Sequence, residues 1–281
     1  MIGALIFAQN NENIDYTKLA IFAAERVIKY LNIPVSIATD NKQWLIDNYP
    51  SHIFDQIIEI KPDGTSQRRT MNDGSFYSMN LAWKNLTRHQ VYDLTPYDET
   101  LVLDSDYILN SSILSKAFDR EYDIQIYKNS FDVAGWRKTN EFIRINEYSI
   151  PFYWATVFFF RKTEITKSFF SLISYIKENW FYYRILYNIE SPTFRNDFAF
   201  SIAIHIMNGK TNGEFVMELP GTMSYCSDKD LLISIDDNAV SLLLAQHANI
   251  EGYFAAKTTG LDVHVMNKIS LGRFIDGGTG V

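Results

Sequence analysis

The chain has 281 residues, 47% of them hydrophobic and 21% charged, so it can bury a sizeable core as one extended domain or as two closely joined halves. Its formal net charge of -7 argues against a protein that coats nucleic acid non-specifically, because that mode of binding needs clustered Lys and Arg. The single cysteine, Cys226, excludes an intrachain disulfide and a thiolate metal cluster, and it fits a cytoplasmic protein.

Short apolar runs alternate with helical patterns in the first half of the chain, as expected for parallel strands joined by crossover helices. A first strand is predicted at residues 2–8, and a helix at 16–30 with Asp15 as its N-cap. The further predicted elements, in chain order, are a strand at 34–38, a short helix at 43–48, a strand at 56–60, a polar loop at 61–74, a helix at 76–88 and a strand at 100–103.

The second half begins with Ser111 or Ser112 as the cap of a predicted helix that ends at Phe118. The apolar run at 151–160 is predicted to be a core strand, because it has about half the length of a membrane-spanning helix. The other predicted elements are a strand at 124–127, helices at 163–180 and 196–207, and a less regular remainder. Without an internal repeat or a linker, the pattern predicts one α/β unit with a C-terminal elaboration.

The strongest chemical signal is the sequence Asp104-Ser105-Asp106, which directly follows the predicted strand at 100–103. Ligands of α/β proteins bind beyond the carboxyl ends of the sheet strands. Two carboxylates there suit Mg²⁺ or Mn²⁺, which would bridge to phosphate oxygens. A bare Asp-x-Asp is also common in surface turns, and the strand context favours the metal site.

On these residues the chain resembles nucleotide-sugar glycosyltransferases of the GT-A class, in particular the glycogenin-like and galactosyltransferase-like branch. The resemblance covers the organisation of about the first 210 residues and the segment 262–268. It implies a GT-A (Rossmann-like) mixed central sheet flanked by helices, in a single catalytic domain spanning 1–281. Within that domain, residues 1–110 would form the nucleotide-binding half, and 111–281 the acceptor-side half with a C-terminal metal-ligand segment.

The same resemblance implies that His264 is the third metal ligand beside Asp104 and Asp106, with Mn²⁺ or Mg²⁺ as the cofactor. Alternation places the imidazole of His264 opposite its neighbours Val263 and Val265, so the side chain can face a cleft. The alternative is a surface histidine on a half-buried strand.

Residues near the ends of the first two strands are implied to bind the donor nucleotide. Tyr16 could stack on uracil, or it could be an ordinary helix-facing tyrosine. One arginine of Arg68-Arg69 is expected to brace the donor phosphates, although such a pair is usually solvated. The predicted donor-binding residues are Ala8, Gln9, Asn10, Tyr16, Asp40, Arg68, Asn80, Ser105 and Lys268.

The helix at 196–207 opens with Asp197, where the family has an acidic residue near the anomeric carbon, so Asp197 is the predicted catalytic residue. A capping carboxylate is the structural alternative. The segment at 154–157 departs from the Asn-x-Gly form of the relatives, which leaves the donor-sugar contacts open. The predicted acceptor and sugar-pocket residues are Trp136, Arg137, Trp154, Thr156 and Asn196.

The expected activity is metal-dependent transfer of a sugar from a UDP-sugar to a hydroxyl group. The Asn-, Ile-, Lys- and Tyr-rich composition resembles that of bacteriophage proteins. This resemblance makes a hydroxymethylated cytosine in phage DNA one expected acceptor, and it implies that the protein acts in the host cytoplasm. A saccharide or protein acceptor and a catalytically silent binding module are the alternatives. A nucleotidyltransferase is disfavoured because residues 8–12 are neither glycine-rich nor basic. The transferred sugar, the stereochemistry and the oligomeric state stay open.

Overall fold

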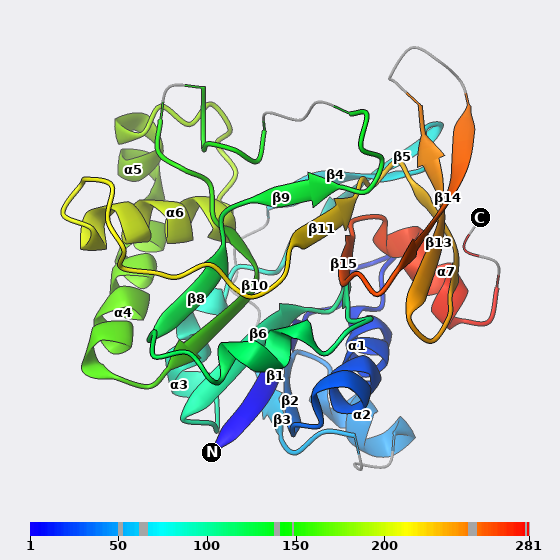
Figure 1. Cartoon of the computed structure of the whole chain (residues 1–281), viewed down its shortest axis with the longest axis horizontal. Helices are drawn as coiled ribbons and strands as arrows, with labels where there is room; N and C mark the ends of the chain where they lie inside the picture. The colour runs from blue at the N-terminus through cyan, green and yellow to red at the C-terminus, as the bar shows by residue number, and fades with distance from the viewer. Residues whose placement is uncertain are drawn as a thin grey trace.

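The computed structural model describes residues 1–49, 53–61, 67–137, 141–147, 149–246, 252–278 and 280. Its centre is a six-stranded mixed sheet with the strand order β3-β2-β1-β6-β10-β8 (Figure 1). In chain order, the strands of this sheet are β1 (Ile2–Ala8), β2 (Val35–Thr39), β3 (Ile57–Glu59), β6 (Glu99–Asp104), β8 (Ile124–Tyr127) and β10 (Trp154–Arg161). The first four are mutually parallel, while β10 runs antiparallel to β6 and β8.

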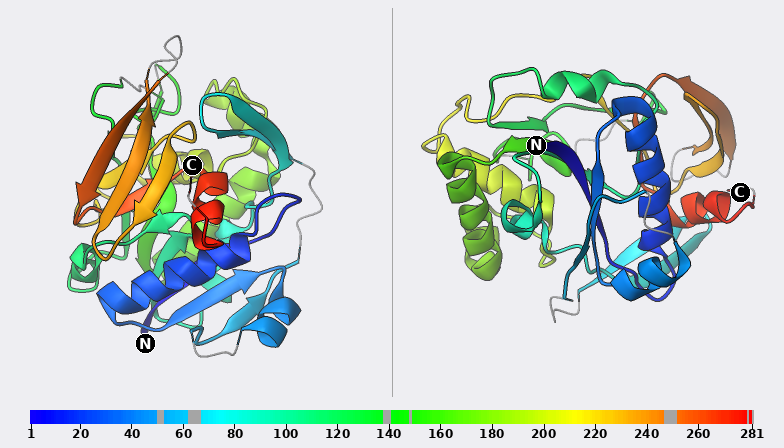
Figure 2. Two further views of the ribbon diagram at one scale, coloured as in Figure 1. Left: turned by 90° about the vertical axis from the view of Figure 1, so that its right-hand side faces the viewer. Right: turned by 90° about the horizontal axis from the view of Figure 1, so that it is seen from below.

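Helices cover both faces of this sheet. Helix α1 (Tyr16–Leu31) packs on β1 and β2 on one face of the sheet. On the other face, α6 (Asn196–Met207) packs on β10, and α4 (Glu164–Glu178) packs against α6 (Figure 2). The remaining helices are α2 (Lys42–Asn48), α3 (Val91–Leu94), α5 (Trp180–Leu186), α7 (Lys268–Ile275) and the 3₁₀ turns Arg88–Gln90 and Ile113–Ala117. The predicted α/β class, a mixed central sheet flanked by helices, is confirmed.

Several elements have the predicted bounds or nearly so. The carboxylate of Asp15 caps α1 by accepting hydrogen bonds from the backbone N–H groups of Thr17 (3.1 Å) and Lys18 (3.2 Å). Strand β10 is buried on both faces, which explains why all of its residues from Trp154 to Phe160 except Thr156 are apolar. The predicted helix ending at Phe118 is only a 3₁₀ turn. Within the described residues, no helix is both long and apolar enough to cross a membrane.

The part of the chain predicted to be less regular instead forms strands and a helix, so that prediction was wrong. A second sheet has the order β7-β15-β11-β9, and a third has the order β12-β13-β14. Their bounds are β7 (Tyr107–Ile108), β9 (Ser130–Asp132), β11 (Met223–Cys226), β12 (Leu231–Ile235), β13 (Ala239–Ala245), β14 (Tyr253–Thr259) and β15 (Val263–Val265). The pairing of β15 with β7 returns the C-terminal segment to the end of β6.

The helix predicted at 76–88 was also wrong, because this region forms a β-hairpin. Strands β4 (Arg68–Asp73) and β5 (Tyr77–Ala82) pair antiparallel, and Met71 and Leu81 are buried in the core. Gly74 adopts a positive φ of 76° in the turn, the conformation that an Asp-Gly pair favours in hairpins. The loop predicted at 61–74 therefore ends at β4, and its residues 62–66 lie outside the described part of the chain.

Candidate active site

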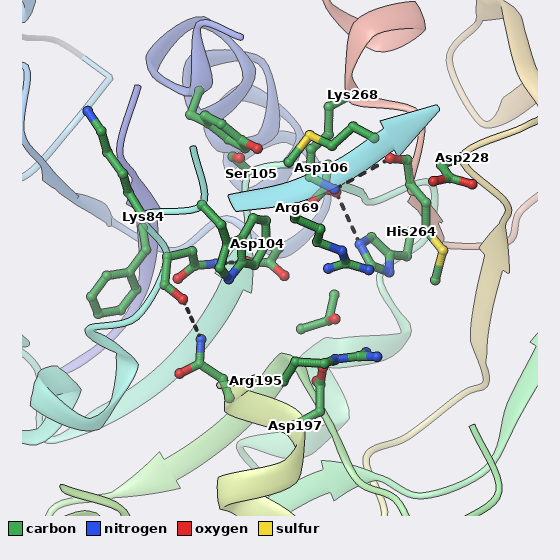
Figure 3. A pocket seen from close by; sticks show the side chains of 18 of the residues that line it. Arg69, Lys84, Asp104, Ser105, Asp106, Arg195, Asp197, Asp228, His264 and Lys268 are labelled. Carbon is green, nitrogen blue, oxygen red and sulfur yellow. Dashed lines mark hydrogen bonds and ion pairs between the residues drawn. The ribbon is translucent and has the colours of Figure 1, made fainter. Parts of the chain in front are cut away.

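A pocket opens at the carboxyl ends of the parallel strands β1 and β6, and the residues that follow these strands line it (Figure 3). Asp104 ends β6, and Gln9 follows β1 on the neighbouring strand. Because β10 runs the other way, its first residues Trp154 and Thr156 reach the same edge. The hairpin β4–β5, the start of α6 and strand β15 complete the walls.

Asp104, Asp106 and His264 meet in this pocket, and their ligand atoms all lie within 4.8 Å of one another. The β7–β15 pairing brings this about, since the N–H of Val265 donates a hydrogen bond of 2.9 Å to the carbonyl of Asp106. The Nε2 atom of His264 then lies 3.1 Å from Oδ2 of Asp106. Asp106 and His264 are buried, at 1% and 7% exposure.

These three residues fit a divalent cation. Their three ligand atoms, two carboxylate oxygens and one imidazole nitrogen, lie within 4.8 Å of one another, so Asp104, Asp106 and His264 could hold one ion together. The Nδ1 atom of His264 is buried and has no hydrogen-bond partner among the described residues, so the ring has no competing contact on that side. Carboxylate oxygens suit Mg²⁺ or Mn²⁺, and the imidazole adds a nitrogen ligand.

Each carboxylate also has a cationic neighbour. Arg88, 1% exposed, forms an ion pair with Asp104, and Nδ2 of Asn85 donates to Asp104 over 3.2 Å. Nζ of Lys268 lies 2.6 Å from Asp106. Burial acts to raise the pKa of Asp106, but the positive charge of Lys268 and the contacts with Lys268 and His264 outweigh it and hold that pKa well below its usual range. Asp106 is therefore ionised at neutral pH.

Asp197 lies in the first turn of α6 and lines the pocket together with the predicted sugar-pocket residues Trp154, Thr156 and Asn196. Figure 3 shows Asp197 beside Arg195. Its carboxylate accepts hydrogen bonds from the backbone N–H of Ala155 (2.9 Å) and from Arg195 (3.0 Å). Arg195, not Asp197, occupies the N-cap position of α6. The neighbouring Asn196 donates a hydrogen bond of 2.8 Å to the carbonyl of Asn85, which ties α6 to the segment carrying Arg88.

The structure brings some of the predicted donor-binding residues into the pocket. Gln9, Tyr16, Ser105 and Lys268 line it. The hydroxyl of Tyr16 and the Nε2 atom of Gln9 are buried and have no hydrogen-bond partner within the described part of the chain. Burial, followed by the negative charge of Asp106, raises the pKa of Tyr16 well above its usual range, so its hydroxyl stays protonated.

Three further predicted donor residues lie beside the pocket, outside its described lining. Ala8 is buried at the end of β1. Asp40 follows β2 and accepts a hydrogen bond of 3.1 Å from the backbone N–H of Asn10. Asp40 also forms an ion pair of 3.4 Å with Lys84, a residue that does line the pocket.

Four predicted site residues lie elsewhere, again outside the lining that the described residues form. Arg68 pairs with Glu12 at 2.9 Å on the outer side of the hairpin, where Asn80 is exposed. The ring of Trp136 packs edge-on against Phe254. Arg137 makes a largely buried ion-pair network whose acidic partners are Asp132 (2.6 Å) and Asp230 (2.7 Å).

Sequence reasoning missed several charged residues that line the pocket: Lys84, Arg88, Arg195 and Asp228. Of the pair Arg68-Arg69, Arg68 was selected as the donor-binding residue, but Arg69 is the one that lines the pocket. Arg88 was assigned to the end of a helix that does not form. Arg69 could have been distinguished from Arg68 by strand alternation, had the segment been recognised as a strand. Asp228 follows β11, which no sequence pattern had indicated.

In comparisons with known proteins, no family model matches the sequence and no curated protein is similar to it. Among solved structures, the chain is similar to the galactosyltransferase LgtC, with 14% identity, a TM-score of 0.46 and coverage of 78% of this chain and 73% of that one. A putative glucose-1-phosphate thymidylyltransferase from Bacillus anthracis has 11% identity and a TM-score of 0.45, with coverage of 80% and 87%.

The glycosyltransferase GlyE from Streptococcus pneumoniae TIGR4 has 11% identity and a TM-score of 0.41, with coverage of 78% of this chain and 46% of GlyE. This chain thus spans a little under half the length of GlyE. The similar structures carry two different enzyme activities, and none of these three TM-scores reaches 0.5. The likenesses therefore establish no activity for this chain, and a functional assignment has to come from the pocket itself.

Proposed function

We propose that the protein is a metal-dependent glycosyltransferase that moves a sugar from a nucleoside diphosphate sugar, specifically a UDP-sugar, to a hydroxyl acceptor. The observation that carries this proposal is the meeting of Asp104, Asp106 and His264 within 4.8 Å at the carboxyl edge of the sheet, in a pocket that also holds Arg88 and Lys268. When bound there, Mn²⁺ or Mg²⁺ supplies positive charge that stabilises a departing diphosphate.

The charges of the pocket support a diphosphate ligand. Arg88 and Lys268 already balance the two carboxylates of Asp104 and Asp106. A divalent cation held by those carboxylates would leave two positive charges in excess, which match the two negative charges of the diphosphate in a nucleotide sugar. Arg88 and Lys268 are then placed to donate hydrogen bonds to phosphate oxygens.

The nucleoside is proposed to lie against Tyr16 and Gln9, where β1 ends. Both side chains offer buried hydrogen-bond donors without a partner among the described residues, and a uracil base or a ribose could accept from them. Such a contact would remove the cost of leaving those groups unsatisfied. Asp40 and Ala8 remain proposed contacts of the ribose or base at the adjoining strand ends.

Asp197 is proposed to act at the anomeric carbon of the donor. In a retaining reaction its carboxylate would steady the positive charge that develops there, and in an inverting reaction it would take the proton of the acceptor hydroxyl. The hydrogen bonds from Ala155 and Arg195 fix its position for either role. The anomeric configuration of the product, measured by NMR, distinguishes the two.

The acceptor is proposed to enter beside Trp154 and Thr156, which line the pocket next to Asp197. Saccharide, protein and hydroxymethylated cytosine acceptors all offer the required hydroxyl group. The first two need only this pocket, whereas DNA also needs a surface that tolerates its phosphates. The net charge of -7 favours the first two.

The test is a panel of nucleotide sugars, with and without Mn²⁺, assayed for thermal stabilisation and for release of the nucleoside diphosphate. We expect at least one UDP-sugar to stabilise the protein only with the metal, because a ligand bound to the folded state raises its apparent stability. The same sugar should release UDP slowly by hydrolysis. Pyrophosphate release from a nucleoside triphosphate would identify a nucleotidyltransferase instead, and stabilisation without any turnover would identify a binding module.

A further inference from the structure

Two arginine side chains reach into the pocket from different walls, and the mechanism above gives Arg69 no role and uses Arg195 only to position Asp197. Arg69 comes from β4 of the hairpin, and Arg195 from the residue before α6. Figure 3 shows both side chains in the same part of the pocket, with Asp197 beside Arg195 and Asp228 farther away. The positive charge of Arg195 lowers the pKa of Arg69, so the two side chains interact electrostatically.

Arg69 is available to a ligand. Its side chain makes no hydrogen bond or ion pair with any described residue, and its guanidinium lies 5.3 Å from the centroid of the Trp83 ring. Stacking on an aromatic face holds the guanidinium plane and leaves its N–H groups free at the edge. The adjacent Arg68 differs, because it points to the other face of the hairpin and pairs with Glu12 at 2.9 Å.

Arg195 is partly engaged, since its terminal nitrogens contact Asp197 (3.0 Å) and Glu141 (3.4 Å). Its guanidinium also lies over the ring of Phe198, 5.0 Å from the centroid. A guanidinium has five N–H donors, so these contacts leave further donors for a ligand. Loss of solvation lowers the pKa of Arg69 and the positive charge of Arg195 lowers it further, while the carboxylates of Asp197 and Asp228 act in the opposite direction.

The donor diphosphate does not account for this pair, because the divalent cation already matches its charge once Arg88 and Lys268 balance the carboxylates of Asp104 and Asp106. We infer that the pocket binds a second anionic group, a carboxylate or a phosphate carried by the transferred sugar or by the acceptor, through Arg69 with support from Arg195. This inference rests on the proposed function and narrows its substrate class. An anion bound beside both arginines would reduce their mutual repulsion. It would also accept hydrogen bonds from the unpaired N–H groups of the Arg69 guanidinium.

The experiment compares two pairs of probes that differ in one charge. The donor pair is UDP-glucuronate and UDP-glucose, each with Mn²⁺, and the acceptor pair is glucose 6-phosphate and glucose, each with UDP and Mn²⁺. Dissociation constants are measured by calorimetry for the wild-type protein and for Arg69→Gln, with Arg68→Gln as the matched control on the same strand. UDP with Mn²⁺ is titrated into all three proteins.

We expect the wild-type protein and Arg68→Gln to bind the charged member of one pair at least about tenfold more tightly than the neutral member, the size of effect that charge-assisted hydrogen bonds give. Arg69→Gln should lose most of that preference. A preference in the donor pair assigns the anion to the transferred sugar, and one in the acceptor pair assigns it to the acceptor. Arg195→Gln, a second variant on a different element, should reduce the same preference.

Two results overturn the inference while leaving the proposed function intact. One is tight binding of UDP with Mn²⁺ but no preference for the charged member of either pair. The other is an equal loss of affinity for UDP and for the charged probes in Arg69→Gln, because Arg69 would then bind the diphosphate. Failure of UDP with Mn²⁺ to bind the wild-type protein would instead contradict the proposed function.

Discussion

At the scale of single residues, Asp104 and Asp106 are held by different means. Arg88 comes from a 3₁₀ turn and pairs with Asp104, whereas Lys268 begins α7 and pairs with Asp106. The two carboxylates are thus fixed from the first and the last third of the chain. A ligand that bridges them also joins those two parts.

Replacing His264 tests its place in the metal site. His264→Ala removes one of the three candidate metal ligands. The affinity for Mn²⁺ should therefore fall by at least about 10- to 100-fold, which is the effect of losing a contact that only supports a ligand. Electron paramagnetic resonance of free Mn²⁺ measures this affinity. His205→Ala, outside the pocket lining, is the control. An unchanged Mn²⁺ titration for His264→Ala would remove His264 from the site.

Much of the metal cluster could be predicted from the sequence, because Asp104 and Asp106 follow an apolar strand and His264 lies between two valines. The charges that surround the cluster could not. Arg88 is adjacent to Asp104 only because the hairpin and the following loop return the chain to the pocket. No local pattern around Arg88 reports a contact with a residue 16 positions later.

At the scale of elements, the hairpin β4–β5 covers one side of the pocket and is tied to the C-terminal segments. Nδ2 of Asn72 donates to Asp228 over 2.9 Å, and the hydroxyl of Tyr253 accepts from the N–H of Ser75 over 2.8 Å. Arg273 of α7 donates two hydrogen bonds, of 2.5 and 2.9 Å, to the carboxylate of Asp73. A bidentate pair of this kind fixes both distance and orientation.

Removing this tie should loosen the hairpin locally. In Arg273→Gln we expect faster hydrogen exchange of the β4–β5 amides, because local opening needs only that these few contacts break. The urea midpoint of the whole protein should change little. Hydrogen exchange followed by mass spectrometry reports both regions at once. Unchanged exchange in the hairpin would show that the Asp73 pair does not hold it.

The buried cysteine of strand β11, Cys226, should make the stability of the protein depend on pH. Burial raises the pKa of the Cys226 thiol far above the value of about 8.5 in an unfolded chain. Above that pH the unfolded state loses the proton and the folded state keeps it, so stability falls as pH rises. Between pH 8 and 10 this group alone should cost about 2 kcal/mol of unfolding free energy.

Urea unfolding at the two pH values checks this cost. Cys226→Ala should lose about 2 kcal/mol less than the wild-type protein over that interval, whatever its own stability at pH 8. Rapid reaction of the folded wild-type protein with a thiol reagent at pH 8 would contradict the burial of Cys226.

Some elements were predictable from the length of an apolar run. Strand β1 and helix α6 have the predicted bounds, because β1 is a run of 7 residues that fits a buried strand and α6 is an apolar segment of 12 residues, which is long for a strand. The segment 76–82 was misassigned because its apolar residues fit both the helical and the strand period, and the pairing with β4 decides between them. For β15 the alternation of Val263, His264 and Val265 gave a local signal, whereas β7 has only two residues and forms through its pairing with β15, so no local pattern predicts it.

At the scale of the whole molecule, an aromatic cluster joins the sheet to the helices on one face. Phe158 of β10 lies 4.9 Å from Phe200 of α6 and 6.1 Å from Phe170 of α4, measured between ring centroids. All three are at most 2% exposed. The cluster therefore supports the strand that presents Trp154 and Thr156 to the pocket.

Phe158→Ala should reduce the free energy of unfolding by about 3–5 kcal/mol, because it leaves a cavity in a packed core. Urea unfolding followed by circular dichroism measures the loss. Phe181→Ala, at a position that is 73% exposed, should change stability by less than about 0.5 kcal/mol. Equal effects at the two positions would contradict the packing described for β10.

The central claim is that a divalent cation held by Asp104, Asp106 and His264 binds the diphosphate of a sugar nucleotide. The most direct measurement is the affinity for UDP, by calorimetry, with Mn²⁺ and with EDTA, in the wild-type protein, in Asp106→Asn and in Asp228→Asn. We predict metal-dependent binding in the wild type and in Asp228→Asn, whose carboxylate lines the pocket outside the cluster, and loss of that dependence in Asp106→Asn. Equal UDP affinity with Mn²⁺ and with EDTA in the wild-type protein would contradict the claim.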